Sequence, residues 1–282
     1  MKQEIINLYD EYTHKPLSRN VFLEKLSKLT GGMTAAMAVL PLLESNYAIA
    51  QSTEEDLHTE YITYAGVNGE MKAYLARPKA DGKYPSVVVI HENRGLTPHI
   101  EDVARRAAKA GFLAIAPNIL STLNPAPANE DEARAAFGTL KPEENTANFV
   151  KAFDFLNTRK DSNGKYGCVG FCWGGAMANS LAVNVPNLKA AVAFYGRQAT
   201  AAEVPKISAA IQLHYASLDE RVNAGIKDYE EALKANNKKY ELHMYDGVNH
   251  AFHNDTSGAR YNEAAAKLAW GRTIEFWKKY LV

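Results

Sequence analysis

The chain has 282 residues, of which 46% are apolar and 23% are charged, as in an ordinary globular protein with a sizeable core. Lysine plus arginine balance aspartate plus glutamate at 32 each, so no excess charge points to nucleic acid or to an anionic membrane surface as a partner. No run of 18 or more apolar residues is present, which argues against a membrane-spanning helix.

The first 57 residues allow two interpretations, a degenerate export signal or a helical extension. Residues 18–25, SRNVFLEK, resemble a twin-arginine signal in which Asn20 replaces the second arginine. A moderately apolar stretch at 31–43 and an A-x-A sequence at 48–50 would complete such a signal, with cleavage before Gln51.

We favour the second interpretation, a helical extension that is retained. Asn20 damages the motif where the export system reads it, and three acidic residues precede it in what should be a basic leader. Apolar residues also recur at helical spacing in this region: Ile5, Ile6, Leu8, Tyr9, Tyr12, Val21, Phe22, Leu26 and Leu29. We therefore expect the protein to remain in the cytoplasm, where a reactive thiol is easily kept reduced. A mature N-terminus at Gln51 would contradict this.

From residue 58 the pattern becomes regular. Residues 60–64 and 71–77 flank a turn at 66–69 and predict a hairpin. The apolar run at 86–90 predicts a strand buried on both faces, and a helix should begin at Pro98 and end at Gly111. The irregular stretch at 120–142 is the expected lid or pocket rim. Further strands are predicted at 112–116, 165–169, 190–195, 209–215 and 240–245, and further helices at 143–156, 174–183, 224–235 and 262–280.

This alternation predicts the fold class. Strands that alternate with helices over such a length imply an α/β fold, with a mostly parallel sheet covered by helices on both faces. We expect this domain to span residues 58–282, behind the N-terminal segment of residues 1–57.

The most informative motif is G-x-C-x-G-G at residues 170–175. It joins the predicted strand at 165–169 to the predicted helix at 174–183. A nucleophile on a sharp strand-to-helix turn needs small residues on either side, because the backbone there is strained and crowded. The motif therefore indicates that Cys172 is a catalytic nucleophile.

Two further candidates follow later strands. Asp219 comes after the predicted strand that ends at residue 215, and His250 after the one that ends at residue 245. In α/β sheets the reactive groups gather at the carboxyl ends of the strands. Taken singly, Asp219 is an ordinary turn residue and His250 an ordinary solvated one. Taken together, in the order nucleophile, acid, histidine, the three residues predict a catalytic triad.

The loop at residues 91–95, HENRG, follows a buried strand and should face Cys172. Its backbone can supply one N–H of an oxyanion hole, with the N–H of Trp173 as the other. A carboxylate at Glu92 would disfavour the thiolate, because like charges resist sharing a small site. The alternative makes Glu92 a surface residue paired with Arg94.

The cysteines and histidines leave two other kinds of site to consider. Two cysteines cannot make a disulfide framework, although Cys168 and Cys172 could form a redox pair. The spacing of His243, His250 and His253 fits no usual zinc pattern. We therefore expect neither a metal nor a cofactor.

With these residues the chain resembles the dienelactone hydrolases (carboxymethylenebutenolidases), which are α/β hydrolases with a Cys-His-Asp triad. The resemblance covers about residues 58–282. It rests on VVVIHENRG at 87–95, GFCWGG at 170–175, FYG at 194–196, the loop of Asp219 and GVNHAF at 247–252. The small members of the family lack the N-terminal segment.

The resemblance implies a role for each site residue. Cys172 would be the nucleophile, His250 the base and Asp219 its orienting acid. Glu92 would hold the resting thiol neutral until substrate displaces it, and the N–H of Asn93 would join that of Trp173 in the oxyanion hole. Because a dienelactone carries a carboxylate, the pocket should contain a cation. The candidate substrate contacts are Arg94, Tyr195 and Arg197.

These residues predict a hydrolase that opens a lactone or a small carboxylic ester through a cysteine thioester. One alternative is a thiol-dependent acyltransferase, or a redox protein that uses Cys168 and Cys172. Another is a non-enzymatic protein whose N-terminal helices bind a partner. We expect a small-molecule substrate, no nucleic acid or membrane partner, and a monomer or small homo-oligomer.

Overall fold

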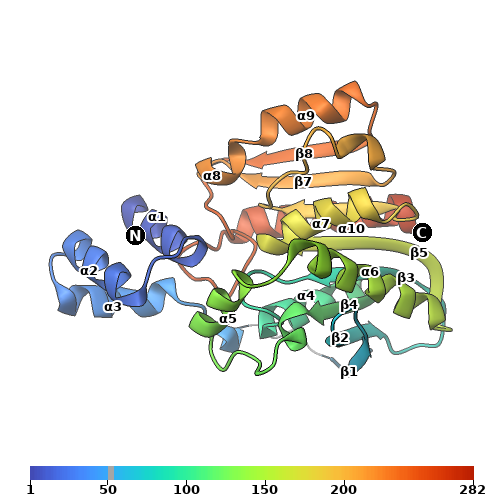
Figure 1. The fold of residues 1–282 in the computed structure, drawn as a ribbon, viewed down its shortest axis with the longest axis horizontal. Helices are drawn as coiled ribbons and strands as arrows, with labels where there is room; N and C mark the ends of the chain where they lie inside the picture. The colour runs from blue at the N-terminus through green and yellow to red at the C-terminus, as the bar shows by residue number, and fades with distance from the viewer. Residues whose placement is uncertain (50–53) are drawn as a thin grey trace.

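The computed structural model describes residues 1–49 and 54–282. Within these ranges, eight strands form one sheet in the order β1-β2-β4-β3-β5-β6-β7-β8 (Figure 1). β2 runs antiparallel to β1 and β4, and the remaining neighbours are parallel. The strands are β1 Leu57–Ala65, β2 Glu70–Pro78, β3 Tyr84–Ile90, β4 Leu113–Asn118, β5 Ser162–Phe171, β6 Ala190–Phe194, β7 Ala210–Ala216 and β8 Tyr240–Tyr245.

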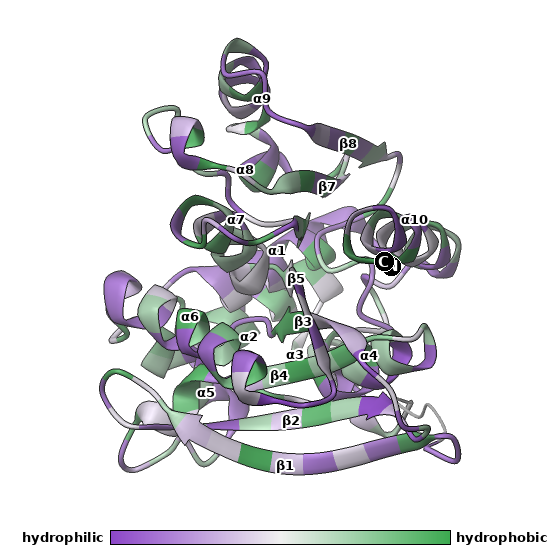
Figure 2. Cartoon of the chain, turned by 90° about the vertical axis from the view of Figure 1, so that its right-hand side faces the viewer, coloured by the Kyte–Doolittle hydropathy of each residue, from purple (hydrophilic) through white to green (hydrophobic). Residues whose placement is uncertain are grey.

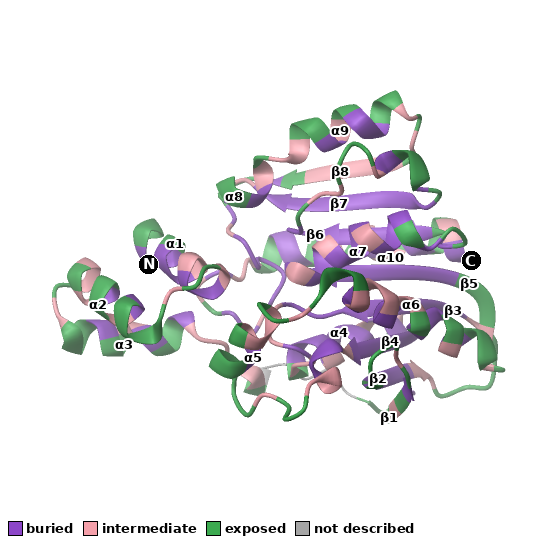
Figure 3. Ribbon diagram, viewed as in Figure 1, coloured by how far each residue is buried: buried purple, intermediate pink, exposed green. Residues whose placement is uncertain are grey.

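Helices cover both faces of this sheet, so the predicted fold class is confirmed. α6, α7 and α9 pack on one face, whereas α4 and α10 pack on the other (Figure 2). The central strands between them are buried along most of their length (Figure 3). These helices are α4 Pro98–Lys109, α6 Pro142–Thr158, α7 Trp173–Asn184, α9 Ile226–Ala235 and α10 Glu263–Leu281.

Local chemistry explains why several elements begin and end as predicted. The predicted hairpin is the antiparallel pair β1 and β2. α4 begins at Pro98, whose missing N–H costs nothing in the first turn. Gly111 follows α4 with φ of 96°, a left-handed conformation that favours glycine. The run Val87 to Ile90 in β3 is fully buried, as expected for a strand covered on both faces.

Two predicted elements differ from the structure. The stretch at 120–142 contains the short helices η2 (Ile119–Thr122) and α5 (Glu130–Phe137). Asn129 caps α5 by accepting a hydrogen bond from Glu132 N, and its side chain bonds the Glu132 carboxylate in return, at 3.0 and 2.8 Å. The predicted helix at 224–235 is α9, which begins at Ile226. A separate short helix, α8 (Glu220–Asn223), precedes it, and Asp219 caps its first turn.

The N-terminal segment contains three helices, α1 (Gln3–His14), α2 (Arg19–Thr30) and α3 (Met33–Leu43), before the turn η1 (Tyr47–Ile49). They share a small apolar core of their own and lie together off one end of the sheet, opposite the C-terminus (Figure 1). Among the described residues, only the pair α2 and α3, bent by 109°, combines the length and apolar character of a membrane span, and no single helix does. The possible cleavage point between Ala50 and Gln51 lies outside the described residues.

Candidate active site

Cys172 occupies the turn between β5 and α7 with φ of 57° and ψ of −113°, a strained conformation for a residue with a side chain. Its backbone N–H donates to Phe194 O at 3.0 Å, which ties the turn to β6. A Cβ at Gly170 would lie 1.8 Å from Gly174 O, and one at Gly174 would lie 2.4 Å from Ile90 O. The glycines of the motif are therefore required by close backbone contacts around the thiol.

His250 and Asp219 meet at the carboxyl ends of β8 and β7. His250 Nδ1 lies 2.5 Å from Asp219 Oδ2, and both side chains are buried. The carboxylate therefore holds a proton on Nδ1, which leaves Nε2 as the nitrogen that can gain or lose a proton. Burial alone would lower the pKa of His250, but the negative charges of Asp219, Cys172 and Asp10 raise it to about 9.

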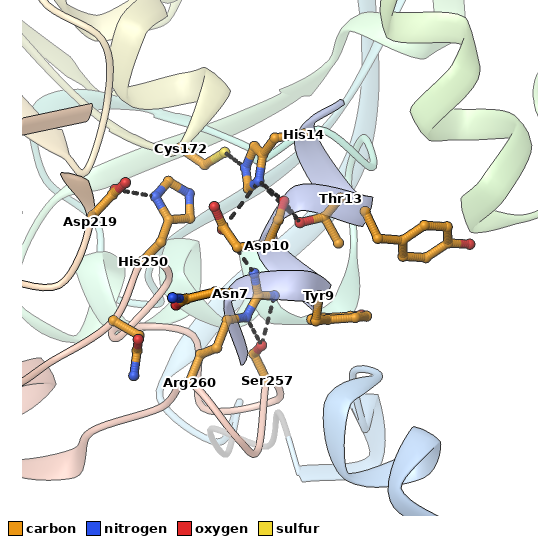
Figure 4. Close-up of polar contacts among 12 residues, drawn as sticks. Asn7, Tyr9, Asp10, Thr13, His14, Cys172, Asp219, His250, Ser257 and Arg260 are labelled. Carbon is orange, nitrogen blue, oxygen red and sulfur yellow. Dashed lines mark hydrogen bonds and ion pairs between the residues drawn. The ribbon is translucent and has the colours of Figure 1, made fainter. Parts of the chain in front are cut away.

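A second imidazole contacts the thiol. His14, the last residue of α1, places Nε2 3.1 Å from Cys172 Sγ (Figure 4). Its Nδ1 lies 2.8 Å from Asp10 O and 3.2 Å from Asp10 Oδ1. The rings of His14 and His250 meet edge to face with centroids 4.7 Å apart. The sulfur is thus flanked by two imidazoles, each held through Nδ1 by an aspartate.

Contacts along α1 fix His14 in this place. The Asn93 side chain donates to Thr13 O at 2.7 Å, which joins the end of α1 to the loop after β3. Arg134 of α5 donates to Tyr12 O at 2.7 Å, and its guanidinium lies 3.8 Å from the centre of the Tyr12 ring. The last turn of α1 therefore contacts three described elements: α5, the β3–α4 loop and the segment around Cys172.

Asp10 supplies a negative charge on this side of the site. Burial alone would raise the pKa of its carboxyl, but the charge of His250, the hydrogen bond from His14 and the Arg260 guanidinium hold that pKa well below its usual range. Asp10 Oδ1 lies 3.8 Å from Arg260 Nη1, and Asp10 Oδ2 lies 3.7 Å from Arg221 Nε. α1 thus brings a permanent negative charge to within the reach of both imidazoles.

One of the two predicted oxyanion donors, the N–H of Trp173, lies beside Cys172, whereas the role of the Asn93 N–H stays a prediction. Trp173 is the first residue of α7, so its N–H has no acceptor within the helix and is free for a ligand oxygen.

Glu92 is buried, and its Oε2 accepts a hydrogen bond from Asn254 Nδ2 at 2.8 Å. The thiol's hydrogen-bond partner in this structure is His14, so the role predicted for Glu92 in holding the thiol neutral stays a prediction.

The predicted substrate contacts lie in different places. A cavity of about 420 Å³ opens between α1 and the loops after β7 and β8, and Arg221 and Arg260 line it beside His250. Arg94 lies in a separate cavity of about 320 Å³, where its Nε pairs with Glu130 at 2.9 Å. Arg197 is exposed at the surface. Tyr195 is buried and packs its ring against that of His250, with centroids 4.8 Å apart.

The two cysteines have separate surroundings. Both are free, and Cys168 packs in the apolar core under α6 and α7, whereas Cys172 belongs to the cluster on the opposite side of the sheet. Burial raises the pKa of the Cys168 thiol to about 12. These surroundings favour an inert Cys168 over a redox partner for Cys172.

The three histidines considered for a metal site also separate. His243 pairs with Glu241 at 3.7 Å and stacks on His214, whereas His253 stacks on Phe171. Only His250 of the three faces Cys172.

The residues at the site that the sequence did not point to are His14, Asp10, Arg221 and Arg260.

The mostly parallel sheet with a strand-to-helix turn at Cys172 defines the protein as an α/β hydrolase. The model of the dienelactone hydrolase family matches residues 71–281. The chain therefore belongs to the dienelactone hydrolase family, as the sequence motifs predicted.

Relatives and a solved structure agree with this assignment. A Salmonella typhi protein provisionally named carboxymethylenebutenolidase is 33% identical over 227 residues, which cover 75% of this chain and 83% of that protein. An Escherichia coli K12 fragment provisionally named hydrolase YghX is 51% identical over 105 residues, 35% of this chain and 90% of the fragment. A Klebsiella pneumoniae structure provisionally described as a dienelactone hydrolase superposes with a TM-score of 0.73 at 27% identity, covering 79% of this chain and 99% of that one.

Proposed function

We propose that this hydrolase opens a lactone or a small carboxylic ester through a thioester on Cys172. The observation that carries the proposal is the pairing of a thiol on a strained turn with a buried imidazole, His250, whose Nδ1 is held by Asp219 and whose Nε2 has no partner among the described residues. This arrangement of nucleophile, base and orienting acid is the one that acyl transfer requires.

The first half of the reaction forms the thioester. The Cys172 thiolate attacks the substrate carbonyl, and the carbonyl oxygen takes up negative charge near the N–H groups of Trp173 and Asn93. The ring or ester C–O bond then breaks. The leaving oxygen takes a proton from the His250 imidazolium, and the acyl group stays on sulfur.

The second half releases the acid. His250 takes a proton from a water molecule, which attacks the thioester carbonyl. The C–S bond breaks, the thiolate leaves, and the imidazolium and thiolate are restored together. Asp219 fixes the imidazole tautomer and stabilises its charged form in both halves. In a lactone the leaving oxygen stays attached to the acyl chain, so a single hydroxy acid is the product.

The cavity beside His250 indicates the class of substrate. Arg221 and Arg260 line it together with Ile6 and Leu218, so it offers both cations and apolar surface. Arg260 is 4% exposed and its Nε and Nη2 are bonded to Ser257 Oγ at 3.0 and 2.9 Å, so its position is fixed. A fixed cation favours a small lactone or ester that carries a carboxylate.

The test is turnover of dienelactone, aryl acetates and larger lactones by the full chain and three variants. Cys172→Ala and His250→Ala should each lower kcat/KM by more than about 1,000-fold while the fold, judged by circular dichroism, is retained. Cys168→Ala is the matched control and should keep its activity. Full turnover in Cys172→Ala would refute the mechanism.

Product analysis separates hydrolysis from acyl transfer. The proposal expects free acid as the main product even when an alcohol or amine acceptor is added in excess. A mass increment on the peptide that contains Cys172, trapped with a slowly deacylating ester, would identify the thioester. Predominant transfer to the acceptor would favour the acyltransferase instead.

A further inference from the structure

We propose that His14, Cys172 and His250 form a binding site for one Zn²⁺ ion, whose occupation reversibly blocks the nucleophile. One ligand atom from each of these three residues lies within 4.8 Å of the other two (Figure 4). They come from α1, the turn after β5 and the loop after β8. No other group of three such side chains gathers in this way in the part of the chain that the structure describes.

The spacing of the three atoms suits a tetrahedral ion. With Zn–N bonds of about 2.0 Å and a Zn–S bond of about 2.3 Å, neighbouring ligand atoms stand roughly 3.4–3.6 Å apart. The contact of 3.1 Å between His14 Nε2 and Cys172 Sγ is slightly shorter than this, and the widest separation is at most 4.8 Å. Side-chain rotations that move these atoms by about 1 Å would therefore bring all three to bonding distance from one Zn²⁺ ion.

Both imidazoles are held as metal-binding imidazoles are. His250 Nδ1 bonds to the Asp219 carboxylate, and His14 Nδ1 bonds to the backbone oxygen and carboxylate of Asp10. Such outer partners fix the ring and the tautomer, and they direct the Nε2 lone pair at the metal. Each Nε2 faces the thiol, so three donors converge on one point.

His250 offers the ion a nitrogen that is otherwise unpartnered. Its side chain is 4% exposed, and its Nε2 is buried without a hydrogen-bond partner among the described residues. A buried nitrogen without a hydrogen-bond partner is costly unless a ligand occupies it. The adjacent carboxylates of Asp10 and Asp219 and the thiolate supply the negative charge that a dication needs.

The ligand set indicates which ion the site takes. One thiolate with two imidazoles is a combination that favours zinc over magnesium or calcium, which prefer oxygen ligands. His14 and His250 both line the cavity of about 420 Å³, so a water molecule from that cavity can fill the fourth position. On binding, the Cys172–His250 pair loses one proton to solvent and the sulfur becomes a zinc thiolate.

Occupation of the site stops the reaction by two effects. The metal holds the sulfur lone pair that would attack the carbonyl, and it also holds the His250 nitrogen that would move the proton. His14 is the residue that adds this property, because a site made of Cys172 and His250 alone has only two ligands. The N-terminal helix would thereby make the hydrolase responsive to zinc.

The experiment titrates the full chain with Co²⁺ and follows the thiolate-to-cobalt charge-transfer band, which needs no substrate and does not depend on the proposed activity. The proposal expects one Co²⁺ per chain, a band that Cys172→Ser removes, and displacement by Zn²⁺. Loss of an outer partner already weakens binding about 10- to 100-fold, so His14→Ala should weaken it by more than about 100-fold. His14→Gln, which keeps the side-chain volume, should do the same.

His58→Ala is the matched control, because His58 is a half-exposed imidazole on β1 that pairs with Glu60. It should bind Co²⁺ as the wild type does. A wild-type protein without the thiolate band, or a His14→Ala protein that binds Co²⁺ with wild-type affinity, would overturn the proposal. Inhibition of ester turnover by Zn²⁺ and its recovery with a chelator would extend the finding to activity.

Discussion

His14 Nε2 lies 3.1 Å from Cys172 Sγ, although the two residues are 158 positions apart in the sequence. The thiol is only 8% exposed, and His14 is the side chain of α1 that covers it. Because the substrate carbonyl must reach this sulfur, we expect substrate binding to displace the His14 ring. The N-terminal segment thus contributes a residue, His14, to the site.

The first prediction concerns the contact that holds α1. Arg134→Ala removes both the hydrogen bond to Tyr12 O and the cation–π contact with the Tyr12 ring. Together they should stabilise docking of α1 by about 1–2 kcal/mol. Hydrogen exchange at the backbone amides of α1 should therefore become about 5- to 30-fold faster, while α7 exchanges as before.

Lys151→Ala is the control for this exchange measurement. Lys151 is a half-exposed residue of α6 whose only ion pair in the described structure is with Asp154 on the same helix. Its removal should leave α1 unchanged. Equal protection of α1 in the wild type and in Arg134→Ala would mean that other contacts hold the helix.

The second prediction distinguishes the two thiols. With a pKa of about 12, the buried Cys168 thiol is ionised to about one part in 10⁴ at pH 8. Iodoacetamide at this pH should therefore alkylate Cys172 and leave Cys168 intact in the folded protein, and it should label both cysteines in guanidinium. Peptide mass spectrometry reads the result. An oxidant such as diamide should give no Cys168–Cys172 disulfide, and formation of that bond would revive the redox alternative.

Local chemistry explains which parts of this protein the sequence could predict. The limits of α4 follow from Pro98 and Gly111, and the turn at Cys172 follows from glycines that only a crowded backbone requires. Each of these signals lies within a few residues of the element it defines. The helix α5 carried such a signal too, in the cap of Asn129, but the prolines just before it favoured an irregular rim.

The contact between His14 and Cys172 has no local signal. The apolar spacing of residues 5–12 predicts a helix with a buried face, yet the same spacing fits any apolar surface that the helix might cover. Docking of α1 at the thiol depends on Asn93 of the β3–α4 loop and on Arg134 of α5, which are both distant from α1 in the sequence. The cation in the cavity was missed for the same reason, since Arg260 enters it from a loop whose path the sequence does not define.

The third prediction concerns acid stability. Asp255 accepts from His99 Nδ1 at 2.9 Å and pairs with Arg106 of α4. Burial alone would raise the pKa of its carboxyl, but the hydrogen bond from His99 and the charge of Arg106 hold that pKa well below its usual range. A depressed pKa gives stability that is present above the unfolded value, near pH 4, and is lost as the pH falls further. Asp255→Asn should therefore lower the unfolding free energy by about 1–3 kcal/mol at pH 7 and by less at pH 3.

Urea unfolding at pH 7, 5 and 3 measures this difference. Asp154→Asn serves as the control, because Asp154 is exposed and pairs only with Lys151 in the described structure. Its effect should stay near zero at each pH. A deficit in Asp255→Asn that is the same at pH 3 as at pH 7 would show that the loss comes from packing and not from the charge of the carboxylate.

The last prediction tests why the turn at Cys172 needs its glycines. In Gly170→Ala the new Cβ would lie 1.8 Å from Gly174 O, an overlap with backbone that no side-chain movement relieves. The strand and the helix must separate, so the variant should lose more than about 3 kcal/mol of unfolding free energy. Cys172 should also lose its alignment with His250.

Gly271→Ala is the opposite case, because its Cβ meets nothing within 4 Å and it lies inside α10. That variant should be more stable by about 0.5–1 kcal/mol, since alanine favours the helix. If urea unfolding gave the two variants the same stability, backbone overlap would not be the reason for the glycine at position 170.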